Sequence, residues 1–417
     1  MTAPFCGIDF GTSNSTVALA DATGARLIAL EGAHRTLPSA VFWDADGAPP
    51  QFGRAAMAAY TGGEDGRLMR GLKSTLGSSL IHEKTRVGNK ALAFTQIVGS
   101  FFAHLRARVV AEAGEVTRAV LGRPVHFVDD DASGDAAAQD VLEGIARAQG
   151  FTEVAFQYEP IAAALHYEQG VAAEELVLIV DIGGGTSDFS IVRVSPERAR
   201  AADRQADILA NDGIRVGGTD FDRLLSLAQV MPHLGFGAAT ADGKGLMPRH
   251  YFIDLATWHR INALYTARTM ADLKALRHLI ARPVLMDRMM RVVGQRHGHA
   301  LALATEEAKI ALSVASDAPI RIGAFTGGPD ASASRAGFEA AVEAPLLRIR
   351  AALENILAQA GLAPGDIGTV FMTGGSSSLP VLHAAVAAVL PGVPVATGDL
   401  LGSVGTGLAL DARRKFG

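Results

Sequence analysis

The chain has 417 residues, of which 49% are apolar and 19% charged, and this is enough for two large domains that each have a core. A formal net charge of -5 argues against nucleic-acid binding, and no apolar run reaches the ~18 residues of a membrane span. The single cysteine, Cys6, cannot form an internal disulfide, and no basic and then apolar leader precedes Asp9. We therefore expect a cytoplasmic protein with no nucleic-acid and no membrane partner.

Apolar spacing predicts strands and helices that alternate along both halves of the chain, which indicates the α/β class. In the first half the predicted strands are 4–8, 16–20, 118–127 and 154–157, and the predicted helices are 101–115, 135–149 and 160–169. In the second half the predicted strands are 176–180, 189–194 and 369–372, and the predicted helices are 305–313, 344–360 and 379–390. A segment at 223–305, rich in Arg, His and Met, is expected to be largely helical.

Two glycine-rich turns occupy corresponding places in the two halves, each after a short apolar strand. The first runs from Asp9 through Gly11, Thr12, Ser13 and Asn14. The second runs Asp181-Ile182-Gly183-Gly184-Gly185-Thr186-Ser187-Asp188. Glycine lets the backbone approach a ligand, and successive N–H groups in such turns form an anion-binding nest. An Asp at a strand end is suited to a hydrated divalent cation on the same anion, so the pair of turns predicts a phosphate site.

With five further segments, these turns make the chain resemble the nucleotide-binding domain of the DnaK-type heat-shock chaperones, in the actin and sugar-kinase ATPase superfamily. The seven similar segments, in order, are 7–15, 72–77, 158–165, 181–188, 217–222, 306–313 and 373–380. The resemblance implies an α/β, actin-like (ribonuclease H-like) ATPase fold of two lobes, each with a core α/β subdomain and a peripheral subdomain.

The same resemblance implies how the chain divides. The expected ranges are 1–36 and 118–172 for the lobe I core, 37–117 for its peripheral subdomain, 173–216 and 343–412 for the lobe II core, and 217–342 for a lobe II peripheral subdomain with an enlarged helical insertion. The inserted segment, together with an expected lack of a peptide-clamping domain, makes the sequence similar to the shorter YegD-like relatives. We therefore do not expect the peptide binding of a full chaperone.

By resemblance, four side chains act in ATP hydrolysis. Lys73 would act on a terminal phosphate or the attacking water, Glu159 on the water or metal shell, and Thr186 and Asp188 on the water and a cation. Lysine is scarce, with seven Lys against 31 Arg, so a compact ammonium at position 73 is a specific choice. Each of two residues also has a non-catalytic alternative. Lys73 could be a solvated surface lysine, and Glu159 could cap the helix that follows it.

The resemblance also implies the cofactors ATP or ADP and Mg²⁺, with K⁺ as an optional further cation. Asp9 and Asp181 would hold Mg²⁺ through its waters. The nucleotide-binding residues would be Gly11, Thr12, Ser13, Asn14, Gly183, Gly184, Gly185, Thr186, Gly217, Gly218, Glu306, Lys309, Ser313, Gly374, Gly375, Ser376 and Asp399. Two positions depart from the chaperones, which carry arginine where this chain has Ile310 and Ser378. Both departures concern how the adenine is held.

Three functions remain open at this point. The leading one is a magnesium-dependent ATP-binding protein with slow hydrolysis, acting as a chaperone-like conformational switch, with a protein client or co-chaperone bound through the lobe II insertion. The second is an actin-like scaffold or filament protein, a class that lacks the segment around Lys73. The third, a small-molecule kinase, would need a catalytic Asp and a substrate pocket that we cannot assign in the sequence.

Overall fold

The computed structural model describes residues 4–87, 90–128, 131–201, 203–398 and 402–417. The chain forms two compact units. The first contains Met1–Arg215, Ala351–Ser377 and Ala387–Gly417, and the second contains Val216–Arg350 and Ser378–Val386.

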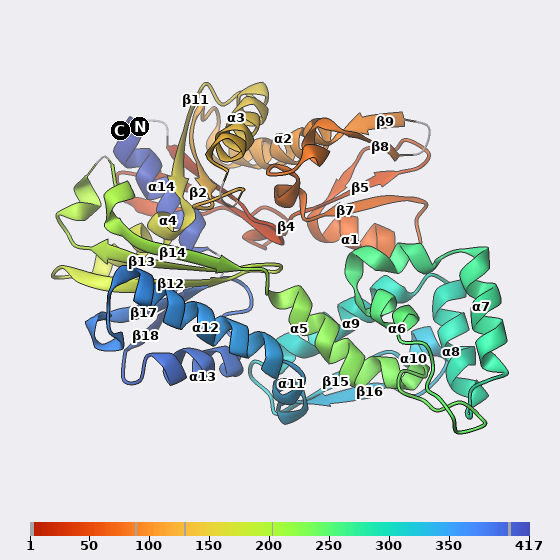
Figure 1. Ribbon diagram of the computed structural model, residues 1–417. Coiled ribbons are helices and arrows are strands. Elements are labelled where there is room, and N and C mark those ends of the chain that lie inside the picture. Colours follow the sequence, from red (N-terminus) through yellow and green to blue (C-terminus); the bar gives the residue numbers. More distant parts are fainter. Residues whose placement is uncertain (1–3, 88–89, 129–130, 202, 399–401) are drawn as a thin grey trace. The chain divides into compact units, whose positions relative to one another are not determined.

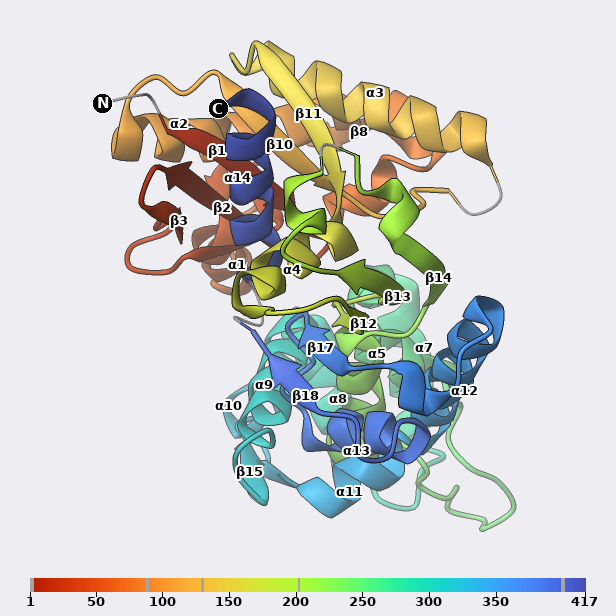
Figure 2. The ribbon, with the colours of Figure 1, turned by 90° about the vertical axis from the view of Figure 1, so that its left-hand side faces the viewer.

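Two sheets of the first unit repeat one topology (Figures 1 and 2). One has the order β11-β10-β1-β2-β3, and the other has the order β14-β13-β12-β17-β18. In each sheet, three sequential antiparallel strands are followed by two parallel ones. The strands are β1 (Phe5–Phe10), β2 (Asn14–Asp21), β3 (Gly24–Leu27), β10 (Arg118–Arg123), β11 (Glu153–Tyr158), β12 (Glu175–Ile182), β13 (Ser187–Val194), β14 (Ile208–Ile214), β17 (Thr369–Thr373) and β18 (Val395–Thr397). The short strand β4 (Thr36–Pro38) pairs with β2.

Helices α4 (Glu159–Tyr167) and α14 (Ser403–Phe416) lie against these sheets (Figure 2). Buried side chains of both helices share one apolar cluster with strands of both sheets, among them Ile161, Leu408, Val120 and Val177. The helices approach closely because Gly407 of α14 lies against the backbone of Ala162, where any side chain would collide. The burial of this cluster fixes the position of the start of α4, and therefore the position of Glu159, its first residue.

The other elements of the first unit form a small sheet, a hairpin and three helices. The sheet has the order β6-β5-β7, and β8 pairs with β9. The bounds are β5 (Ala40–Asp44), β6 (Gln51–Phe52), β7 (Gly66–Arg70), β8 (Lys84–Val87), β9 (Lys90–Ala93), α1 (Gly53–Thr61), α2 (Phe94–Ala113) and α3 (Ala132–Ala148). Apolar side chains of α2 and α3 pack in a core that includes Phe10, Phe101 and Leu142. A short 3₁₀ turn, Leu72–Thr75, follows β7 and carries Lys73.

The second unit is mainly helical. Its elements are α5 (Gly218–Leu225), α6 (His250–Ala256), α7 (Ala267–Arg277), α8 (Pro283–Gly294), α9 (Gly298–Ala311), β15 (Asp317–Ile320), α10 (Gly323–Thr326), β16 (Ala331–Ser334) and α11 (Arg335–Ala341). Helices α12 (Glu343–Ala360) and α13 (Pro380–Val389) each contribute to both units. None of the described helices is long and apolar enough to cross a membrane.

Most predicted elements are present, with shifted ends. Helix α2 begins seven residues before the predicted 101, and α9 begins seven residues before the predicted 305. Strand β10 ends at Arg123 instead of 127, because Pro124 has no N–H to continue the ladder. The elements that the predictions missed include β14, the C-terminal helix α14, α1 and the short strands β3 to β9 and β18. The four-part division into lobes and subdomains stays a prediction.

Candidate active site

Asp9 and Glu159 come from neighbouring parts of one sheet. Strands β1, β10 and β11 are parallel, so their carboxyl ends lie at the same edge. Asp9 is next to the last residue of β1, and Glu159 directly follows β11 as the first residue of α4. Pro160 occupies the second position of the helix, where a missing N–H costs nothing. Strand order therefore brings together two carboxylates that lie 150 residues apart in the sequence.

Asp181 and Asp188 lie at the corresponding edge of the second sheet. They face each other in the antiparallel register of β12 and β13, and Thr373 of β17 pairs with Asp181 on its other side. Thr186 Oγ1 donates a hydrogen bond to Asp188 Oδ2 at 3.0 Å. Gly374 follows β17 with φ +87°, and a side chain there would meet the Asp181 carboxylate. Glycine at 374 thus keeps space beside a predicted metal ligand.

The two glycine-rich turns touch each other. A Cβ atom on Gly184 would overlap the Ser13 hydroxyl, so the second turn can approach the first only because residue 184 has no side chain. The Gly183 N–H donates to the Thr186 carbonyl at 2.9 Å and closes the second turn. The first turn requires glycine at position 11, because a Cβ atom there would collide with the Asn14 carbonyl oxygen. The turn residues predicted to bind phosphate are therefore neighbours in space.

Lys73 lies next to Glu159. Its Nζ forms an ion pair and hydrogen bond with Glu159 Oε1, and both side chains are largely buried, with 11% and 17% of their surfaces exposed. Burial by itself would lower the pKa of Lys73, but the Glu159 and Asp9 carboxylates outweigh this and raise the pKa. The ammonium therefore stays charged at neutral pH, and its burial against Glu159 argues against the solvated-lysine alternative.

Negative charge accumulates at this site. Burial raises the pKa of Asp9 to about 7, and the Glu159 carboxylate adds to this while Lys73 opposes it. Burial also raises the pKa of Asp181 to about 8, with further contributions from Asp188, Glu159 and Asp9. One lysine cannot balance these carboxylates, so the site favours a bound cation or proton.

A pH-dependent stability follows from Asp181. Its pKa is 3.8 ordinarily and about 8 in the fold, so the folded protein binds more protons than the unfolded chain between these values. Without metal, the fold therefore loses stability as pH rises through this window. We expect Asp181→Asn to raise the melting temperature of the metal-free protein at pH 8 by several degrees, and to change it little at pH 5.

Differential scanning fluorimetry in EDTA at both pH values measures this effect. Asp46→Asn, which removes an exposed carboxylate, is the matched control and should change neither value. An Asp181→Asn protein that melts at or below the wild-type temperature at pH 8 would show that this carboxylate is not under electrostatic strain.

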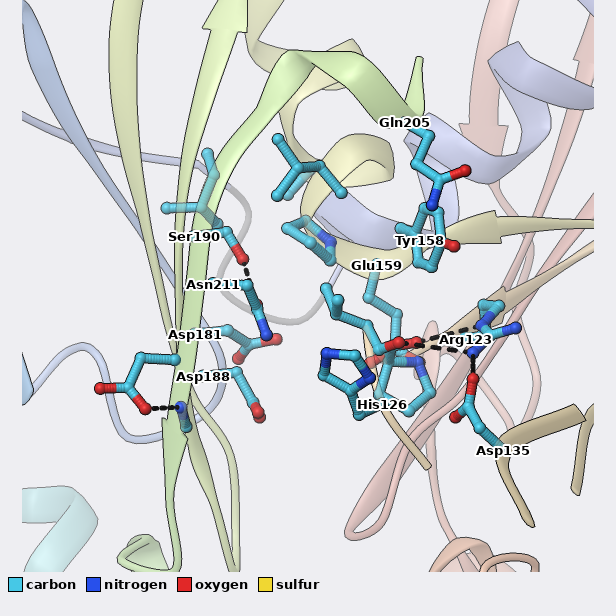
Figure 3. Close-up of a pocket in the computed structure, with 18 of the residues that line it drawn as sticks. Arg123, His126, Asp135, Tyr158, Glu159, Asp181, Asp188, Ser190, Gln205 and Asn211 are labelled. Atoms are coloured by element: carbon cyan, nitrogen blue, oxygen red, sulfur yellow. Dashed lines mark hydrogen bonds and ion pairs between the residues drawn. The ribbon is translucent and has the colours of Figure 1, made fainter. Parts of the chain in front are cut away.

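A cleft of about 1010 Å³ opens beside these groups, wholly within the first unit (Figure 3). Asp181 and Asp188 from the β12–β13 pair face Glu159 and Arg123 across it. Sequence reasoning missed Arg123, which is buried, binds Asp135 and Gln139, and lies 5.2 Å from the Tyr158 ring centroid. Arg123 lies at the end of β10, beside β1 and β11, and this position at the sheet edge could have indicated that it lines the site.

The carboxylates at this site are better suited to a hydrated Mg²⁺ ion than to a metal that is held only by protein side chains. Among the described residues, no group of three or more His, Cys, Asp or Glu side chains is arranged to hold a metal directly. Magnesium usually keeps several waters and binds through one or two carboxylates plus substrate phosphates. Burial, and then the neighbouring carboxylates, raise the pKa of Asp9 and Asp181, and a hydrated cation beside them would stabilise their charged forms. The site therefore fits the predicted ion.

The predicted nucleoside residues fall in both units. Gly217, Gly218, Glu306, Lys309 and Ser313 belong to the second, while Gly374, Gly375 and Ser376 belong to the first. Asp399 lies outside the described residues. In the second unit, Lys309 Nζ forms a 2.8 Å ion pair with Asp222 and a 3.3 Å hydrogen bond to the Gly218 carbonyl. Ser313 Oγ lies 3.3 Å from Ser378 Oγ. Ile310 is 59% exposed, so it can present an apolar surface. The roles of all these residues in nucleoside binding stay predictions.

Two sheets of one topology, with glycine turns and carboxylates at their edges, define the actin-like, ribonuclease H-like class of ATPase folds. The model of the family described as Hsp70 protein matches residues 5–230 and 291–412. The chain therefore belongs to the Hsp70 family, and the predicted resemblance and fold class are confirmed. Residues 231–290, which separate the two matched ranges, lie inside the segment that the sequence marked as an insertion.

Similar proteins carry the name of a chaperone. The chain is 26% identical to the chaperone protein HscA homolog of Aromatoleum aromaticum, 28% to that of Bordetella petrii and 27% to the chaperone protein HscA of Edwardsiella ictaluri. Each comparison covers 97% of this chain and 57% of the relative. The chain thus spans little more than half the length of these relatives.

Proposed function

We propose that this chain is a magnesium-dependent ATP-binding protein that hydrolyses ATP slowly and acts as a chaperone-like conformational switch. The observation that carries the proposal is the meeting of two glycine-rich turns beside Asp9, Asp181, Glu159 and Lys73. Backbone N–H groups in such turns bind phosphate oxygens, while the carboxylates attract the cation that accompanies them. Membership of the Hsp70 family and the chaperone relatives support the same function.

We assign the proposed roles as follows, with the geometry of the site as support. Asp9 and Asp181 would hold hydrated Mg²⁺, which would offset phosphate charge when bound. Lys73, oriented by Glu159, places a positive charge where negative charge develops during phosphoryl transfer. Glu159 and Asp188 are the acceptors for the protons of an attacking water, and Thr186 orients Asp188 through its hydrogen bond. K⁺ is proposed only as a further cation at the same cluster.

Partners and compartment are proposed on separate grounds. A protein client or co-chaperone would bind through the inserted segment, because residues 231–290 lie outside the family match. The cytoplasm is proposed because the one cysteine, Cys6, is buried and unpaired, as expected of a protein from a reducing compartment.

Isothermal titration calorimetry with ATP and ADP, with and without Mg²⁺, tests the proposal. We expect micromolar or tighter binding that weakens when Mg²⁺ is removed, and ADP release measured over hours. The Asp9→Asn/Asp181→Asn protein should lose most of the Mg²⁺ dependence, because the carboxylates that attract the ion are gone. Absence of binding by either nucleotide at millimolar concentration with Mg²⁺ would refute the function.

A further inference from the structure

The inserted segment, residues 223–305, differs in charge from the rest of the chain. It contains eleven Lys and Arg, four Asp, no Glu and six of the twelve His, so its formal net charge is +7 in a chain of net charge -5. The remaining residues therefore carry -12. This segment lies within the second unit, in the part of Figure 1 that carries the labels α6 to α9.

Most of these cations have no acidic partner among the residues that the structure describes. Arg223, Arg260 and Arg277 pair with Asp220, Asp254 and Asp287. Across the described parts of the chain, none of the other eight forms an ion pair; they are Lys244, Arg249, Arg268, Lys274, Arg282, Arg288, Arg291 and Arg296. The remaining acids are already engaged, Asp242 with Thr240 and Asp272 with Tyr251. The segment is therefore suited to an acidic partner.

A small apolar strip lies among these cations. Residues 238–241 pair with 245–247 and with 279–281 through the bridges Ala239 to Leu246 and Thr240 to Ile280. Side chains alternate across such pairs, and Ile280 and Met247 point into the core. The opposite face exposes Ala239, Ala241, Leu246, Leu279 and Ala281, followed by Val284. Leu246, Leu279 and Val284 are 64%, 55% and 47% exposed.

The strip also has a free edge. Hydrogen bonds join Thr240 N–H to the Gly245 carbonyl and Met247 N–H to the Ala238 carbonyl, both at 2.9 Å. In this antiparallel pattern the Leu246 N–H and C=O point away from their partner strand. Lys244 lies at the hairpin turn, Arg249 follows the edge, and Arg282 follows Ala281. We call the edge, the apolar strip and these three cations the basic edge.

We propose that the basic edge binds an extended acidic peptide segment of a partner protein, in which acidic side chains alternate with apolar ones. The backbone of the segment would pair with Leu246, its apolar side chains would cover the strip, and its carboxylates would meet Lys244, Arg249 and Arg282. A peptide fits better than a nucleic acid, because phosphodiesters would leave the apolar strip exposed to water. The inference names the partner class for the proposed function but does not depend on ATP binding.

Fluorescence anisotropy of the full chain with a labelled peptide that alternates Glu and Leu tests the proposal. We expect binding that weakens with salt, and at least tenfold weaker binding by the Lys244→Glu/Arg282→Glu protein. Leu246→Pro, which removes the edge N–H, should weaken binding by a similar factor. Arg321→Glu, an exposed arginine of the same unit outside the segment, is the matched control and should bind as wild type does.

Circular dichroism establishes that each variant is folded, and the assay is run with and without ATP. Peptide binding without nucleotide binding would refute only the proposed function. The inference is overturned if the peptide does not bind, if a Lys and Leu peptide binds equally well, or if the charge-reversed and Leu246→Pro proteins both bind normally. Tighter binding of RNA or of vesicles rich in phosphatidylserine than of the peptide would also overturn it.

Discussion

Lys73→Ala is expected to lower the rate of ATP hydrolysis by about 10²-fold or more while changing nucleotide affinity much less. The ammonium is held by Glu159 beside Asp9, where it would act on charge that develops in the transition state, and such a contact supplies about 3 kcal/mol. Under the proposed function, ground-state binding would depend mainly on the glycine-rich turns and Mg²⁺, which the substitution leaves in place. Single-turnover hydrolysis and calorimetry separate the two quantities.

Two companion proteins make the Lys73 result specific. Lys84→Ala removes an exposed lysine of β8 and should hydrolyse ATP as wild type does. Glu159→Gln should slow hydrolysis, and the double variant should lose less than the product of the two effects, because the two side chains act as a contacting pair. If Lys73→Ala hydrolyses ATP at the wild-type rate, the role of Lys73 is only to form a structural ion pair.

Gly184→Val should abolish nucleotide binding and leave most of the fold intact. The valine side chain would overlap the Ser13 hydroxyl, so the two turns would have to separate. The N–H groups that we propose to bind phosphate would then no longer converge. Calorimetry with ATP and Mg²⁺ measures binding, and circular dichroism measures the fold. A folded protein with normal affinity would show that the turns do not form the phosphate site.

Second-site variants separate the two reasons for glycine at 184. If the overlap with Ser13 is the cause, binding by Gly184→Ala should improve in the Gly184→Ala/Ser13→Gly protein, judged against Ser13→Gly alone. If a side chain at 184 instead collides with phosphate, the second substitution restores nothing. Gly144→Ala is the matched control, since a Cβ at that position of α3 meets no atom within 4 Å.

Local sequence was sufficient to predict the elements whose sequence pattern spans only a few residues. The apolar runs before Asp9 and Asp181 predicted β1 and β12, and the glycines after them predicted the turns, because strand and turn preferences are local. Local signals failed for α14, whose small residues pack against the strands and α4: Gly405 meets Thr16, and Gly407 meets Ala162. Tertiary packing selects small residues there, and their helical pattern is weak.

The sequence by itself determined that the chain is an α/β protein with two glycine-rich turns and an acidic residue at each, and ordered motifs identified the Hsp70 family. Only the tertiary structure decided that Lys73 meets Glu159, that Gly184 meets Ser13, and that Arg123 lines the cleft. The physical reason is that a motif records which groups are present, whereas parallel strand order and the packing of α4 and α14 decide which distant groups share one edge. The raised pKa values of Asp9 and Asp181 follow from the same packing, because the fold buries both carboxyl groups and places further carboxylates beside them.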